Sequence, residues 1–281
     1  MNILISGIHG FVGTNLVSAY KSQHAIYGLD IISPQKDGVL NTFAWDELDK
    51  IPEIDIIIHL AGKAHDTKNQ TNSEAYFEIN TGLTKKIYDW FLKSNAKKFV
   101  FFSSVKAVAD SVSRTYLTED VKPNPKTPYG KSKLEAEKYI LNQQIPIGKK
   151  VYILRPSMIH GPGNKGNLNL LYKLVSKGIP WPLGTFDNKR SFTSIDNLIF
   201  MLNQIIENDI EAGVYNVSDD NPISTNRLIE LISKSRSRKA KIWKVNKKLI
   251  SFGAQIGDLL RLPLLISIKN KKTNGYQQYI I

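Results

Sequence analysis

The stretch that decides the fold lies at the start of the chain and reads Asn2-Ile3-Leu4-Ile5-Ser6-Gly7-Ile8-His9-Gly10-Phe11-Val12-Gly13. Its apolar beginning predicts a strand, and residues 11–20 predict a helix. A glycine-rich turn between strand and helix lets a pyrophosphate approach the backbone and the free N–H groups of the helix start. The stretch therefore predicts a dinucleotide-binding loop made by Gly7, Gly10, Phe11, Val12 and Gly13.

An acidic residue follows the next predicted strand, residues 25–30. Asp30 stands 17 positions after Gly13, where a carboxylate can accept hydrogen bonds from the adenosine ribose hydroxyls. The same carboxylate would repel a 2′-phosphate, so we expect NAD rather than NADP. Leu60-Ala61-Gly62 follows the third apolar strand and lets the backbone pass close to the cofactor. Asn80 is either a polar contact beneath the cofactor or a surface residue.

Strands and helices alternate through the first half of the chain. Further strands are predicted at residues 55–60, 98–103 and 151–155, and helices at 73–94 and 129–142. The run Asp55-Ile56-Ile57-Ile58-His59-Leu60 is nearly all apolar, as in a strand buried on both faces. The pattern predicts an α/β fold, a Rossmann-type doubly wound parallel sheet with a smaller mixed C-terminal substrate lobe.

The pattern loosens after Pro156, where proline and glycine become frequent. Helices are predicted at 168–177, at 196–207 and from about 224, with a strand at 213–217. We expect an NAD-binding Rossmann domain at 1–160, to which parts of 185–220 return, and a substrate-binding lobe at 161–281. Residues 246–262 could form an amphipathic helix that packs on the core or contacts a membrane surface.

Composition excludes several classes of protein. The 281 residues hold no cysteine, so disulfides and thiolate metal sites are excluded, and we predict no metal. No signal peptide and no run of about 18 apolar residues is seen, so we expect a cytoplasmic protein.

Net charge is +13, and residues 223–281 carry 13 Lys or Arg against only Glu230 and Asp258. This basic stretch is a solvated face with phosphate-binding groups, or it meets an anionic membrane or a lipid diphosphate. No recognition motif accompanies it, so nucleic acid is not a predicted partner.

The stretch Tyr129-Gly130-Lys131-Ser132-Lys133 places Tyr129 and Lys133 four residues apart at the start of a helix, on one face. A free tyrosine has a pKa of about 10, and a nearby ammonium group favours the phenolate. Tyr129 can then take a proton from a sugar hydroxyl while hydride leaves to a nicotinamide. Ser103-Ser104 ends a strand and offers a hydroxyl to orient the same oxygen.

Taken in order, these motifs resemble the extended short-chain dehydrogenase/reductase family in its nucleotide-sugar epimerase/dehydratase branch, and they are similar to UDP-glucose 4-epimerases. Further matching segments are Leu154-Arg155-Pro156, Gly161-Pro162-Gly163, Gly166-Asn167-Leu168 and Arg190 ahead of Ile195-Asp196-Asn197. The resemblance implies bound NAD and a homodimer. It implies catalysis by Ser104, Tyr129 and Lys133. It implies cofactor contacts from the glycine-rich loop, from Asp30, from Leu60-Ala61-Gly62 and from Asn80. It adds Tyr129, Lys133 and Pro156 to these cofactor contacts. It implies substrate contacts from Ser104, Lys106, Tyr129, Asn167, Leu168 and Arg190.

The resemblance favours NAD-dependent 4-epimerisation of a UDP-hexose or UDP-N-acetylhexosamine through a 4-keto intermediate, for surface polysaccharide synthesis. Lys106 stands where dehydratases often carry an acidic residue, which argues against dehydration. Three alternatives stay open. They are an NAD(P)H-dependent 4-keto reductase of a UDP-deoxy-sugar, an epimerase of a lipid-diphosphate-linked sugar, and a non-catalytic NAD-binding protein.

Overall fold

The structure is a computed structural model that describes residues 1–32, 34–63, 73–112, 116–164, 166–186 and 188–250. The chain divides into two compact units. The first unit consists of Met1–Gly163 and Thr193–Asp219, and the second consists of Asn164–Phe192 and Asp220–Ile281. The substrate-binding role expected for residues 161–281 stays a prediction.

Seven strands form one sheet in the order β3-β2-β1-β4-β5-β6-β9, and every neighbouring pair is parallel. The strands are β1 Asn2–Ser6, β2 Ala25–Leu29, β3 Asn41–Phe43, β4 Ile56–His59, β5 Lys98–Phe102, β6 Lys150–Pro156 and β9 Gly213–Val217. Two short strands, β7 Met158–His160 and β8 Phe192–Ser194, pair separately. Strand order reverses between β1 and β4, the position at which open parallel sheets bind ligands. The predicted doubly wound sheet is confirmed.

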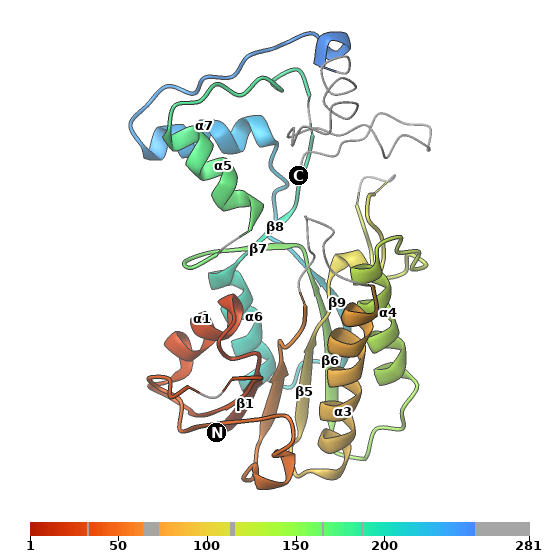
Figure 1. Cartoon of the computed structure of the whole chain (residues 1–281). Coiled ribbons are helices and arrows are strands. Elements are labelled where there is room, and N and C mark those ends of the chain that lie inside the picture. Colours follow the sequence, from red (N-terminus) through yellow and green to blue (C-terminus); the bar gives the residue numbers. More distant parts are fainter. Residues whose placement is uncertain (33, 64–72, 113–115, 165, 187, 251–281) are drawn as a thin grey trace. The chain divides into compact units, whose positions relative to one another are not determined.

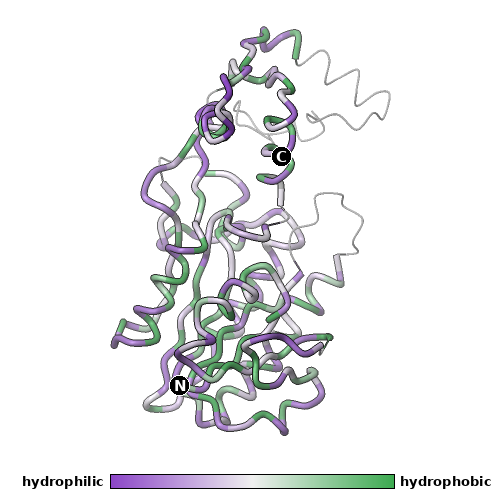
Figure 2. Tube along the Cα trace, turned by 90° about the vertical axis from the view of Figure 1, so that its left-hand side faces the viewer, coloured by the Kyte–Doolittle hydropathy of each residue, from purple (hydrophilic) through white to green (hydrophobic). Residues whose placement is uncertain are grey.

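Helices cover both faces of this sheet (Figure 1). Those of the first unit are α1 Phe11–Tyr20, α2 Ser73–Tyr76, α3 Leu83–Lys93, α4 Pro128–Leu141 and α6 Ile195–Glu207, with single turns η1 Leu48–Lys50 and η3 Val105–Ala107. The second unit contains α5 Asn167–Ser176 and α7 Thr225–Ser235. Figure 2 shows hydrophobic and hydrophilic residues alternating along the helices, as helices with one buried face require.

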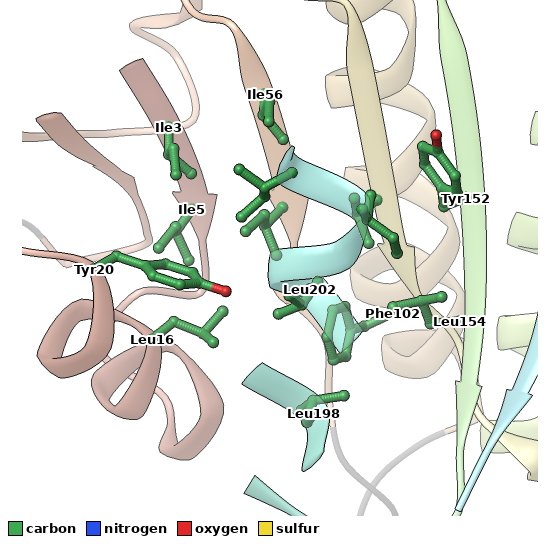
Figure 3. Close-up of a cluster of buried hydrophobic side chains, with 14 of the residues drawn as sticks. Ile3, Ile5, Leu16, Tyr20, Ile56, Phe102, Tyr152, Leu154, Leu198 and Leu202 are labelled. Carbon is green, nitrogen blue, oxygen red and sulfur yellow. The ribbon is translucent and has the colours of Figure 1, made fainter. Parts of the chain in front are cut away.

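Alternate residues of each strand enter two separate cores. Ile3 and Ile5 of β1 pack with α1 and α6, while Leu4 between them packs with α3 and α4 on the other face. Figure 3 shows the first of these cores, in which Leu198 and Leu202 of α6 face the sheet. Burial on both faces explains why the strands read as continuous apolar runs.

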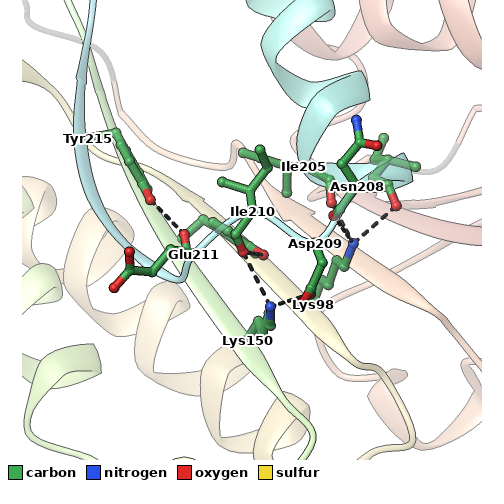
Figure 4. Close-up of polar contacts among 10 residues, drawn as sticks. Lys98, Lys150, Ile205, Asn208, Asp209, Ile210, Glu211 and Tyr215 are labelled. Carbon is green, nitrogen blue, oxygen red and sulfur yellow. Dashed lines mark hydrogen bonds and ion pairs between the residues drawn. The ribbon is translucent and has the colours of Figure 1, made fainter.

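Two lysines fasten the segment that follows α6 to the sheet (Figure 4). Lys98 Nζ donates to the carbonyl oxygens of Ile205 at 2.6 Å and of Asn208 at 3.1 Å. A cation at the end of a helix satisfies carbonyl groups that lack a partner within the helix. Lys150 pairs with Asp209 and also donates to the Ile210 carbonyl at 3.3 Å. These contacts direct the chain into β9 and complete the sheet.

The helix predicted at 73–94 is present over residues 73–93, but it is not α-helical throughout. It consists of α2, a π-helical segment η2 at Phe77–Gly82, and α3. A π-turn adds a residue to the helical spacing, which local propensity does not reveal, and such turns are frequent at functional sites. The short strands β3, β7 and β8 were not predicted, and the helix predicted at 246–262 lies largely outside the described residues.

The second unit has its own small core of Trp181, Leu183 and Ile229, against which Ala240 and Ile242 pack. Backbone hydrogen bonds join Trp181 to Lys241 and Trp243 at 2.8 Å each. Among the described residues, no helix combines the length and the apolar character that crossing a bilayer requires.

The packing of α6 against the sheet can be tested with a matched pair of variants. Leu202 is fully buried, whereas Phe200 on the same helix is 64% exposed. Leu202→Ala should lower the free energy of unfolding by about 2–5 kcal/mol, because it leaves a cavity between α6 and the sheet. Phe200→Ala should change it by less than about 0.5 kcal/mol. Urea denaturation measures both, and equal losses would contradict this packing.

Candidate active site

The glycine-rich loop is held by contacts that exclude larger residues. Gly7 has φ +70°, and a Cβ there would lie 2.9 Å from the Ala61 Cα. A Cβ at Gly13 would lie 2.6 Å from the Gly7 carbonyl oxygen, so α1 begins directly against the loop. Gly10 caps α1 without any side-chain hydrogen bond, which leaves first-turn N–H groups for an anion. This cradle fits the pyrophosphate of a dinucleotide.

Asp30 follows β2 and faces the glycine-rich loop. Its Oδ2 accepts from the backbone N–H of His9 at 3.1 Å and lies 3.1 Å from His9 Nδ1. Lys36 Nζ, which donates to the Ile8 carbonyl at 2.9 Å, lies close enough to Asp30 for the carboxylate to oppose the burial that lowers the lysine pKa. The ribose contact predicted for Asp30 stays a prediction. The sequence analysis missed these two basic neighbours.

Asn80 is fully buried within η2, so the alternative that it is a surface residue is wrong. Its Oδ1 accepts from the Lys63 N–H at 2.7 Å, and its Nδ2 donates to Ser132 Oγ at 2.9 Å. A Cβ at Gly62 would lie 2.9 Å from Asn80 Oδ1 and 3.1 Å from Lys133 Nζ. Gly62, which follows Leu60 and Ala61 after β4, thus packs directly on Asn80 of η2 and Lys133 of α4.

Tyr129 lies in the first turn of α4, which Thr127 caps by accepting from the Gly130 N–H at 3.2 Å. A side chain at Gly130 would collide with the Lys106 carbonyl oxygen, so α4 packs tightly against η3. This brings Tyr129 next to Ser104, whose hydroxyl acts on the pKa of the phenol. The structure therefore places together two of the three predicted catalytic side chains, from the end of β5 and the start of α4.

Lys133 is buried one turn farther along α4. Its Nζ donates to the Phe102 carbonyl at 2.8 Å and lies 5.0 Å from the centre of the Phe101 ring. Burial lowers the pKa of Lys133 to about 8, and the Glu137 carboxylate opposes that shift. Glu137 accepts from Arg155 Nε at 2.9 Å and Nη2 at 2.6 Å, and also from the Ser103 hydroxyl. A buried ion pair therefore lies behind the predicted catalytic lysine.

The pKa of Tyr129 differs from the expectation. Burial raises it, the Ser104 hydroxyl opposes the rise, and the nearby Tyr76 adds to it. The Tyr76 and Tyr129 rings are 6.3 Å apart and nearly perpendicular. The expected effect of Lys133 on the phenolate stays a prediction; its ammonium donates to the Phe102 carbonyl, and Ser104 is the group that favours the phenolate here.

The remaining predicted residues are spread over both units. Pro156 ends β6 in the first unit, and Lys106 in η3 pairs with Asp110 at 3.5 Å. Asn167 and Leu168 begin α5 in the second unit. Arg190 is also in the second unit; its backbone pairs with Ile223, and burial lowers its pKa. Within the described part of the chain, no cluster of His, Asp or Glu is arranged to hold a metal ion.

A model of the NAD dependent epimerase/dehydratase family matches residues 3–218. The chain belongs to this family. That membership confirms the resemblance, the enzymatic class and the NAD cofactor predicted from the sequence.

Individual proteins agree with this assignment. The chain is 35% identical over 243 residues to a UDP-glucose 4-epimerase of Vibrio cholerae, covering 81% of this chain and 74% of that protein. It is 26% identical to an N-acetyl-alpha-D-glucosaminyl-diphospho-ditrans,octacis-undecaprenol 4-epimerase of Escherichia coli O157:H7, over 85% of this chain and 73% of that one. The solved UDP-N-acetylglucosamine 4-epimerase of Bacillus cereus shares the fold, with a TM-score of 0.74 at 19% identity over 88% of this chain and 85% of that one.

Sequence reasoning missed five residues that surround the predicted site. Ser6, His59, Tyr76, Ser132 and Glu137 are buried around it but received no role. Glu137 follows Lys133 by four positions, the spacing that places two residues on one helix face. That spacing is the one signal that could have revealed it.

Because Lys133 is buried, replacing it should have opposite effects on stability and on activity. Its pKa is lower in the folded protein, about 8, than in the unfolded chain, so the folding penalty is fully present below pH 8 and is relieved as pH rises toward the unfolded value. Lys133→Met should therefore raise the free energy of unfolding at pH 7 by on the order of 1 kcal/mol while abolishing turnover. The gain should shrink above pH 8.

Urea denaturation at pH 7 and pH 10 measures this, and Lys131→Met on the exposed side of α4 is the matched control. Lower stability of Lys133→Met at pH 7 would show that the attraction of Glu137 exceeds the cost of burying the ammonium.

Proposed function

We propose that this protein interconverts a UDP-hexose or UDP-N-acetylhexosamine with its C4 epimer through a 4-keto intermediate, in surface polysaccharide synthesis. The observation that carries the proposal is that the Tyr129 phenol lies close enough to Ser104 for the serine hydroxyl to act on its pKa, beside buried Lys133 at the edge of the sheet where the glycine-rich loop lies. The 35% identity to a UDP-glucose 4-epimerase supports the same reaction.

NAD would be held by Gly7, Gly10, Phe11, Val12 and Gly13, by Asp30, and by Leu60, Ala61, Gly62, Asn80 and Pro156. Bound NAD supplies the acceptor that takes hydride from C4 and returns it. Tyr129 Oη accepts the proton of the C4 hydroxyl as the carbonyl forms, and it gives that proton back when the carbonyl is reduced on its other face. Ser104 orients the C4 oxygen. Lys133, one turn farther along α4, would favour the phenolate of Tyr129.

The residues expected to contact the substrate belong to both units. Lys106 lies beside Ser104, while Leu168, Asn167 and Arg190 belong to the second unit. Arg190 suits a diphosphate because its planar set of donors matches phosphate oxygens. We propose a homodimer as the working form, in the cytoplasm.

The reaction is tested by incubating the protein with UDP-glucose and with UDP-N-acetylglucosamine, with no cofactor added. NMR should show the 4-epimers, because an epimerase returns the hydride it removes. Tyr129→Phe should lower turnover by roughly 10²-fold or more, since it removes the proton acceptor. Turnover only of 4-keto sugars with consumption of NADH would indicate a reductase instead, and NAD binding without either reaction would indicate a non-catalytic protein.

We also propose that the basic segment of the second unit contacts anionic lipid. Lys239, Lys241 and Lys244 are exposed there, and Trp243 among them is 58% exposed. Tryptophan flanked by lysines is typical of segments that lie at a membrane interface. The 26% identity to an epimerase of a lipid-diphosphate sugar supports such a location.

Vesicle sedimentation tests this contact. The protein should bind phosphatidylglycerol vesicles more strongly than phosphatidylcholine vesicles, with a blue shift of Trp243 fluorescence. Replacing Lys239, Lys241 and Lys244 by Gln should weaken binding roughly 100-fold, at about 1 kcal/mol per charge. The same replacement of Lys86, Lys93 and Lys97, which are exposed in the first unit, is the matched control. If both triple variants lose vesicle binding equally, the binding depends on net charge and not on this segment.

A further inference from the structure

The last residue of β4, His59, is fully buried, and both of its ring nitrogens have partners. Nδ1 lies 2.6 Å from Ser6 Oγ at the end of β1. Nε2 lies 2.9 Å from Thr84 Oγ1 in the first turn of α3. Ser6 and Thr84 are likewise fully buried. The ring therefore joins two elements that lie far apart in the sequence.

The neighbouring bonds determine which nitrogen carries the proton. The Thr84 hydroxyl donates to the Asn80 carbonyl at 2.6 Å, so its oxygen must accept from His59 Nε2–H. Nδ1 is then the acceptor and receives the Ser6 hydroxyl proton. Ser6 Oγ in turn accepts from the Ala61 N–H at 3.2 Å. We call the series Ala61, Ser6, His59, Thr84 and Asn80 the His59 network.

The ring stays neutral in this network. Burial lowers the pKa of His59 well below its ordinary value, and the charge on Lys133 lowers it further. A neutral imidazole donates at one nitrogen and accepts at the other, as the His59 network requires. A charged ring would have two donors and would oppose the Ser6 hydroxyl.

The two ends of the His59 network reach the two halves of the site. At one end, Ser6 directly precedes Gly7, and Ala61 packs on Gly7. At the other end, the Asn80 side chain donates to Ser132 Oγ at 2.9 Å, and the Ser132 hydroxyl donates to the Tyr129 carbonyl at 2.8 Å. Thr81 also donates to the Ser132 carbonyl at 3.0 Å. The cofactor loop and α4 are thus joined by consecutive hydrogen bonds.

We propose that His59 is a positioning residue that sets the cofactor loop and the Tyr129 end of α4 in register with each other. The proposal rests on the proposed function for the role of Tyr129. Bonds on the Ser6 side hold the loop that binds NAD. Bonds on the Thr84 side hold η2, and through Ser132 they hold the turn that carries the phenol.

Substitution of His59 by Asn or by Gln can test the Ser6 bond and the Thr84 bond separately, because each amide side chain reproduces one of the two ring nitrogens. The amide of Asn reaches the position of Nδ1, so His59→Asn can keep an acceptor for Ser6 but loses the bond to Thr84. The longer Gln reaches the position of Nε2, so His59→Gln can keep a donor to Thr84 but loses the bond to Ser6. Ser6→Ala and Thr84→Val remove the same two bonds from the partner side.

The experiment measures the dissociation constant for NAD by calorimetry and turnover of the UDP-sugar at saturating NAD. His59→Gln and Ser6→Ala should weaken NAD binding about tenfold and leave turnover within about twofold, the effect of one buried hydrogen bond. His59→Asn and Thr84→Val should lower turnover about tenfold and leave NAD binding within about twofold. Thr84→Ser keeps the hydroxyl and should retain turnover.

Thermal unfolding of each variant separates positioning from a structural role. If the four variants lose melting temperature but keep NAD affinity and turnover, the proposal is overturned. It is also overturned if the Ser6-side variants and the Thr84-side variants change NAD affinity and turnover to the same extent. If the unmodified protein converts no UDP-sugar, the proposed function fails, yet the NAD measurements still decide whether the Ser6 side differs from the Thr84 side.

Discussion

The ammonium group of Lys133 is buried in the first unit, and much of the surrounding structure compensates for that burial. A charge in such a place costs several kcal/mol unless it is paired and hydrogen-bonded. The Phe102 carbonyl accepts from it, and Glu137 supplies the opposing charge while held by Arg155 and Ser103. These groups come from β5, β6 and α4, so the packing of this unit and the chemistry of its site depend on the same contacts.

Backbone proximity is the second constraint. Gly7 packs against Ala61, Gly13 against the Gly7 carbonyl, and Gly130 against the Lys106 carbonyl. Each contact brings together two elements that a Cβ would separate. The contacts of Gly7 and Gly13 place the N-terminus of α1 against the edge of the sheet. The contact of Gly130 places Tyr129 next to Ser104. Small residues therefore set the distances on which the site relies, while polar residues such as Asn80 hold them.

The residues proposed for proton transfer and those proposed for nucleotide binding belong to different units. Ser104, Tyr129 and Lys133 all belong to the first unit, and the family model matches residues 3–218, which include nearly all of that unit and part of the second. The residues proposed to bind the nucleotide, and most of the excess positive charge, belong to the second. Under the proposed function, changes among these second-unit residues would alter which sugar or carrier is bound while the proton-transfer residues stay the same.

Local patterns were enough to predict the parallel sheet, the glycine-rich loop and the spacing of Tyr129 and Lys133, because each is written in a short run of consecutive residues. The π-turn at η2, the buried environment of His59 and the Arg155–Glu137 pair were decided by tertiary structure. So was the raised pKa of Tyr129, which reverses the expectation drawn from the lysine four residues away. Burial and hydrogen-bond partners depend on segments such as Ser6 and His59, 53 residues apart, that only folding brings into contact.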